Sequence, residues 1–178
     1  MTPDELLDKY RAFTHEAVRV EALQHYVVPG DQDRQQAFRE GRPLPTRPDK
    51  QTSVELIADA VAAGKTIWRI HVVDFPLSDY VRYEIAAYAE NIAAGEHVWI
   101  ADRASHPGLD AVRRDFALFD HHTDHASLIW YNYTPAGQLV GYTPGVPDEV
   151  AEGVQQLALA REHASPLVDF MTSRKETR

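Results

Sequence analysis

The stretch KTIWRIHVVDFPLSDYVRYEIAAYAENIAAGEHVWIADR, residues 65–103, decides the fold because its hydrophobic period changes twice. Side chains over 67–74 alternate between apolar and polar, which is typical of a strand. After Ser78, an expected N-cap, apolar residues recur every three or four positions and predict an amphipathic helix. Gly95 ends that helix, and a second strand follows over 98–101. Residues 65–103 are therefore predicted to form a βαβ unit with parallel strands.

The rest of the chain predicts an α/β fold with α+β character: a mixed β-sheet that holds the parallel βαβ unit and a C-terminal antiparallel meander, flanked by helices. We interpret residues 1–178 as a single domain. Its parts are an N-terminal helix (1–14), the βαβ unit (65–103), antiparallel strands (115–143) and C-terminal helices (147–173).

Four further boundaries follow from local patterns. Alternation over 17–26 predicts another strand, which places Arg19 and Glu21 on one charged face. A helix is predicted over 53–63 after a proline-rich extended loop. Another is predicted over 148–163, and Ser165-Pro166 is expected to start a last short helix.

Composition excludes several classes of function. The formal charge is −9 and lysine is scarce, so nucleic-acid binding is not expected. No run is long and apolar enough for a membrane span, and no signal peptide is visible. The absence of cysteine removes disulfides, thiol catalysis and thiolate metal sites, and it fits a cytoplasmic location. GxSxG, P-loop, GxGxxG and HExxH motifs are absent, so no motif names an activity.

Five segments carry a resemblance to a known family: VRVEALQHYVVPGD, FREGRP, AGK with RIHVVDFPLSDYVRYE, AAGEHVWIADR and DFALFD. Together they resemble a bacterial family known as domain of unknown function 6879, over roughly residues 13–119. The resemblance implies a stand-alone cytoplasmic domain, often encoded near helix-turn-helix regulators, and it supplies no catalytic residues. The histidine-rich DHHTDH departs from the family pattern. The recurrent positions are Arg19, Glu21, Tyr26, Arg69, the 76–80 turn, Glu84, Gly95-Glu96 and Asp115-Phe116.

Charged and polar side chains are expected to converge near the carboxyl end of the strand at 67–74, where open α/β sheets bind ligands. If the strand that holds Arg19 and Glu21 lies beside it, a buried charged cluster results. Such a cluster suits a small anionic molecule, with His71 as a possible acid or base; the alternative is an internal salt-bridge network without a ligand. The candidate ligand-binding residues are Arg19, Glu21, Arg69, His71, Asp74, Tyr80, Arg82 and Glu84.

The DHHTDH segment offers imidazole and carboxylate groups, which are ligands for zinc or non-haem iron. The candidate ligands are His121, His122 and His125. A turn could bring His121 or His122 together with His125, and a third ligand from elsewhere, such as His71 or Asp74, would still be needed. The sequence favours a polar turn between two strands, so no metal or other cofactor is expected.

Two functions from different classes remain open. The favoured one is a non-catalytic regulatory or interaction module that binds a partner protein, such as a transcriptional regulator, or a small anionic ligand. The alternative is a small-molecule enzyme that uses Arg69, His71, Asp74 and Glu84 as a general acid/base site. The sequence decides neither whether the chain is an enzyme nor its oligomeric state.

Overall fold

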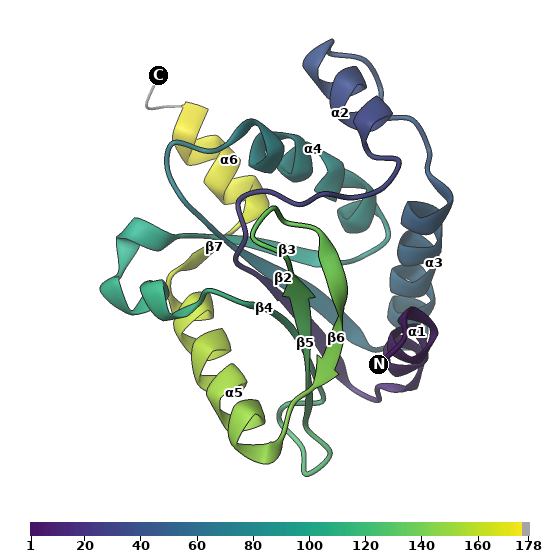
Figure 1. Ribbon diagram of the computed structural model, residues 1–178, viewed down its shortest axis with the longest axis vertical. Helices are drawn as coiled ribbons and strands as arrows, with labels where there is room; N and C mark the ends of the chain where they lie inside the picture. The colour runs from purple at the N-terminus through teal and green to yellow at the C-terminus, as the bar shows by residue number, and fades with distance from the viewer. Residues whose placement is uncertain (176–178) are drawn as a thin grey trace.

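A seven-stranded mixed sheet forms the centre of the molecule, in the order β6-β5-β4-β1-β2-β3-β7 (Figure 1). The computed structural model describes residues 1–175, so the last three positions of the predicted domain 1–178 lie outside the described residues. The strands are β1 (Glu16–Glu21), β2 (Thr66–Val73), β3 (His97–Asp102), β4 (Asp115–Phe119), β5 (Ser127–Tyr133), β6 (Leu139–Pro144) and β7 (Ala164–Pro166).

The predicted βαβ unit is confirmed. Strands β1, β2 and β3 are parallel neighbours, and helix α4 (Asp79–Ala93) connects β2 to β3. The hydroxyl of Ser78 accepts a hydrogen bond from the Val81 amide at 3.1 Å, as an N-cap should. Strands β4, β5 and β6 pair antiparallel and form the predicted meander, which joins the parallel strands where β4 pairs with β1.

The sheet separates two apolar layers (Figure 1). Helix α5 (Pro147–Glu162) covers one face, where Val18 and Val20 of β1 and Ile70 and Val72 of β2 are buried. The opposite face carries helices α1 (Pro3–Ala12), α3 (Pro48–Ala62), α4 and α6 (Leu167–Lys175). Helix α2 (Gln32–Arg39) packs outside α4, with the ring centroid of Phe38 6.0 Å from that of Tyr83.

Three predicted boundaries are wrong. Strand β1 ends at Glu21 rather than at residue 26. Beyond that point the Gln24 side chain, instead of the backbone of β1, hydrogen-bonds with the carbonyl of Val72 and the amide of Asp74. Helix α3 begins at Pro48 rather than Ser53, since proline suits the first helical turn.

The third boundary lies at the end of the sheet. Residues 164–166 form strand β7, paired antiparallel with β3, where a helix start was predicted. Pro166 is tolerated there because an edge strand leaves one row of backbone groups unpaired. No helix within residues 1–175 combines the length and apolar character needed to cross a membrane.

Candidate functional site

The parallel pairing of β1 with β2 brings the predicted charged residues together. Arg19 lies opposite Arg69, and Glu21 lies opposite His71. Side chains alternate along both strands, so these four groups share the face that carries α1, α3 and α4. The neighbouring-strand arrangement on which the predicted cluster depended is therefore confirmed.

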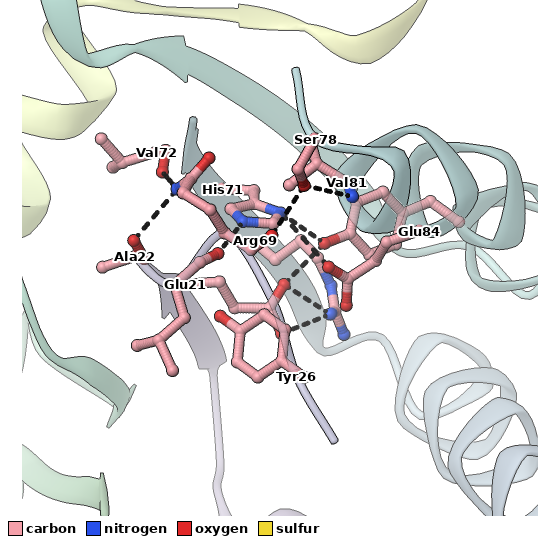
Figure 2. A network of polar contacts seen from close by, with 12 residues as sticks. Glu21, Ala22, Tyr26, Arg69, His71, Val72, Ser78, Val81 and Glu84 are labelled. Carbon is pink, nitrogen blue, oxygen red and sulfur yellow. Dashed lines mark hydrogen bonds and ion pairs between the residues drawn. The ribbon is translucent and has the colours of Figure 1, made fainter. Parts of the chain in front are cut away.

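Ion pairs connect the cluster into one network. Arg69 donates from Nη1 to Glu21 Oε2 at 3.0 Å and from Nε to Glu96 Oε1 at 2.9 Å. Figure 2 shows the Arg69 side chain reaching the Glu21 carboxylate. Arg19 pairs with Asp115 at 2.7 Å and lies 3.5 Å from Glu21. Burial opposes ionisation of Glu21, but Arg69 and Arg19 outweigh it and lower the pKa of this carboxyl, which stays ionised between them.

His71 is fully buried and both of its ring nitrogens have partners (Figure 2). Nε2 lies 2.9 Å from the carbonyl oxygen of Leu23, and Nδ1 lies 3.0 Å from the hydroxyl of Tyr88. A carbonyl only accepts, so Nε2 carries a hydrogen. The Tyr88 hydroxyl in turn donates to Glu21 Oε2 at 2.7 Å. His71 is thus a fixed link between the Leu23 backbone and the ion-pair network.

Glu84 lies at the edge of this network. Its Oε2 atom is 3.6 Å from His71 Nδ1 and has no hydrogen-bond partner among the described residues. Burial, together with the nearby charge of Glu21, raises the pKa of Glu84 well above its usual value. The protonated form of this carboxyl is therefore favoured beside an ionised Glu21.

The other predicted site residues lie around or outside the cluster. Tyr80 is buried at its edge, with its ring centroid 5.7 Å from that of Tyr26. Asp74 pairs instead with Arg103 at 2.7 Å and is half exposed. Arg82 is exposed and donates to the Leu77 carbonyl at 3.2 Å. The structure thus unites Arg19, Glu21, Arg69, His71 and Glu84, with Tyr80 next to them, and leaves Asp74 and Arg82 apart.

The set of predicted site residues did not include Asp115, Glu96 or Tyr26. Asp115 is fully buried and accepts from Arg19, from the Tyr26 hydroxyl at 2.8 Å and from the Ala22 amide at 2.8 Å. A signal was present in the sequence, because an acidic residue directly before the apolar run Phe116–Phe119 needs a partner once it is buried.

A cavity of about 540 Å³ lies against this network, between the sheet face and helices α1 and α3. Its charged lining residues are Arg19, Glu21, Arg47, Asp49, Arg69 and Glu96. Its apolar and aromatic walls are formed by Leu6, Leu7, Tyr10, Leu56, Ile57, Ile67, Tyr131, Tyr133 and Tyr142.

Three lining residues have a buried donor nitrogen without a hydrogen-bond partner within residues 1–175: Arg19, Arg47 and Trp68. Arg47 Nε lies 2.6 Å from Asp49 Oδ1 in an ion pair, and Arg19 is the one that belongs to the buried ion-pair network. Its guanidinium carbon lies 3.3 Å from the ring centroid of Tyr131, which is a cation–π contact. Nη2 donates to Asp115 and, at 3.2 Å, to the Tyr133 hydroxyl. Nη1 is buried and has no hydrogen-bond partner within residues 1–175.

A smaller cavity of about 100 Å³ adjoins α4 and α2 and is lined by Tyr80, Glu84 and Tyr88. Arg69 and Arg47 line both cavities. Glu84, whose Oε2 has no hydrogen-bond partner within the described chain, therefore lines a cavity that is too small for most ligands. Arg19 lines a cavity of ordinary ligand size.

The histidine-rich segment forms the turn between β4 and β5, as predicted. His121 and His122 lie near Glu16, whereas His125 lies outside that group and is exposed. Neither His71 nor Asp74 belongs to the group.

Comparison with known proteins agrees with the resemblance in the sequence. A search of curated proteins finds no match to this chain. The model of the family described as domain of unknown function (DUF6879) matches residues 4–172, which is nearly the whole chain. The chain belongs to the DUF6879 family.

Proposed function

We propose that this chain is a non-catalytic regulatory domain that binds a small molecule in the cavity between α1, α3 and the sheet. The ligand has an apolar or aromatic body and presents one acceptor oxygen, of a carboxylate or a carbonyl group, to Arg19. The observation that carries the proposal is the partnerless Nη1 of the buried Arg19, in the wall of a cavity of about 540 Å³.

Size and lining support this function. Small-molecule pockets typically measure roughly 300–1,000 Å³ and combine apolar walls with a few polar groups. A buried donor without a partner costs about 1–3 kcal/mol, so a ligand oxygen that accepts from Nη1 would recover free energy on binding. Tyr131 packs against the guanidinium group of Arg19 at 3.3 Å, which restricts the orientation of this donor before a ligand arrives.

Charge sets the class of the acceptor. Arg19 and Arg69 face the carboxyl groups of Glu21, Glu96 and Asp115, so the cationic charge of the wall is already matched. Burial raises the pKa of Asp115, which lessens the excess of negative charge. A cationic ligand group would meet a partnerless donor and is therefore disfavoured, whereas a carboxylate or an amide oxygen would satisfy it.

The alternative interpretation as an acid/base enzyme stays a prediction, although Glu84 lies 3.6 Å from His71. His71 has no exposed surface, and both of its nitrogens are engaged. Asp74, another of the four expected members of the set, pairs with Arg103 away from the cavity. A regulator protein as partner also stays a prediction. Of the two expected partners, a protein and a small molecule, the cavity favours the small molecule.

Three probes of one shape test the proposal: 2-naphthylacetic acid, 2-naphthylacetamide and 2-naphthylethylamine, titrated into the protein by isothermal calorimetry. We expect the acid and the amide to bind with one site per chain and the amine to bind far more weakly. If the acid alone binds, the ligand is anionic; if both bind, the acceptor oxygen is the requirement.

Leu56→Trp fills the cavity and should abolish binding. Glu55→Trp is the matched control, because residue 55 is exposed on the same helix and should leave binding intact. Circular dichroism confirms that both variants are folded. The proposal is wrong if none of the probes binds the wild type, or if Leu56→Trp binds as well as Glu55→Trp.

A further inference from the structure

The turn between β4 and β5 is fixed against the start of β1 by Asp120. Its carboxylate accepts hydrogen bonds from the amides of Thr14, His15 and Glu16 at 2.7–3.2 Å. The Asp120 amide donates to the Glu16 carbonyl at 2.8 Å. These bonds fix the positions of the Glu16 and His121 side chains relative to each other.

Three ligand atoms converge at this point. Glu16 Oε2 lies 3.0 Å from His121 Nδ1 and 3.8 Å from His122 Nε2, and the three atoms all lie within 4.8 Å of one another. They come from two segments more than 100 residues apart in the sequence. The sequence had indicated histidines of this turn as candidate ligands, but it could not supply the carboxylate of Glu16 as the third.

Two of these atoms lack a hydrogen-bond partner. Glu16 Oε2 and His121 Nδ1 are buried and have none within the described chain. The two atoms are 3.0 Å apart, which is ion-pair distance, and neither makes a hydrogen bond by geometry. Buried polar atoms are seldom left in this state, so the pair points to a group that is held between them.

The spacing fits a divalent metal ion. Zinc binds imidazole nitrogen and carboxylate oxygen at about 2.0–2.2 Å, and in a tetrahedral site two such ligands lie about 3.4 Å apart. The separations of 3.0 and 3.8 Å from Glu16 Oε2 lie on either side of that value. One carboxylate with two imidazoles is also a ligand set of zinc in known three-ligand sites.

We propose that Glu16, His121 and His122 form a Zn²⁺ site that ties the β4–β5 turn to the first residue of β1. The imidazole of His122 is 80% exposed, so the fourth position opens to solvent and is filled by water. This site lies outside the group of residues that lines the 540 Å³ cavity, and the proposal does not depend on ligand binding there.

Zinc titration of the tag-free protein, stripped with EDTA and desalted, tests the site by isothermal calorimetry. We expect one Zn²⁺ per chain for the wild type and an increase in the unfolding temperature on binding. Loss of an outer-shell partner weakens metal affinity about 10–100-fold, so loss of a direct ligand should weaken it at least about tenfold. His121→Ala, His122→Ala and Glu16→Gln should each show that loss.

His125→Ala is the matched control, since it removes an exposed histidine of the same turn that lies outside the group. It should bind zinc like the wild type. The His122 side chain is mostly exposed, so the His122→Ala variant should fold like the wild type, and a loss of zinc binding in it cannot be attributed to misfolding. The absence of stoichiometric binding in the wild type would overturn the proposal. Equal affinities of His122→Ala and His125→Ala would also overturn it.

Discussion

A Cβ atom on Gly153 would lie 2.2 Å from Cδ1 of Leu128, so helix α5 approaches strand β5 closely only because residue 153 has no side chain. Both residues are buried on the face of the sheet that α5 covers. The helix is thereby seated against the sheet, and the α5 layer is close-packed at this point.

Gly153→Ala is expected to destabilise the protein by about 1–3 kcal/mol, because the added methyl group overpacks the interface. This outcome runs against the helix propensity of alanine, which would favour the variant by up to about 1 kcal/mol at an exposed position. Urea unfolding measures the change. Leu128→Ala should relieve the clash, so the double variant should lose less stability than the sum of the single variants. Gln155→Ala, on the exposed side of α5, is the control and should change stability by less than about 0.5 kcal/mol.

Arg69→Met should cost about 3–5 kcal/mol, because it leaves the buried carboxylates of Glu21 and Glu96 without their shared partner. Chemical denaturation checks the value, and Arg82→Met provides an exposed arginine on α4 for comparison. A loss of less than about 1 kcal/mol would contradict the prediction and mean that the network does not stabilise the fold.

Arg103→Met should also destabilise strongly. Arg103 is buried and donates to the carbonyl oxygens of Leu109, Val112 and Ala22 at 2.7–3.0 Å, so its removal leaves buried acceptors unpaired. Each unpaired group costs about 1–3 kcal/mol. Asp74→Asn removes only the half-exposed partner and should cost less than about 1 kcal/mol. Comparable losses for the two variants would contradict this division.

Lys50 should make the stability depend on pH in the alkaline range. Burial, followed by the nearby charge of Arg69, lowers the pKa of Lys50 to about 8. Between pH 8 and about 10.5 the unfolded chain binds a proton that the folded chain has released, so this contribution to stability rises with pH. The shift corresponds to at most about 3 kcal/mol.

The measurement compares the free energy of unfolding of the wild type with that of Lys50→Met across this pH range. The free energy of unfolding of the wild type should increase relative to that of Lys50→Met as the pH rises. Lys9→Met removes an exposed ammonium group and shows how much of the trend belongs to Lys50. A constant difference between wild type and Lys50→Met would refute the prediction.

Much of the architecture could be predicted because local patterns determine it. The change from alternation to a helical period around Ser78 and Gly95 predicts β2, α4 and β3 without any knowledge of the rest of the chain. The charged face of Arg19 and Glu21 follows from the same alternation. Strand β7 was missed because three residues are too few to show a period, and their pairing with β3 depends on where the chain returns.

The candidate sites show the same division between local pattern and tertiary contact. The sequence by itself determined which side chains share a strand face, since alternation is a property of the local backbone. Only the tertiary structure decided that Asp115 from β4 neutralises Arg19 from β1, and that Glu16 lies beside His121 and His122. It also decided that Asp74 turns to Arg103. These contacts join residues that are distant along the chain, and their formation depends on strand order and register, which no local period encodes.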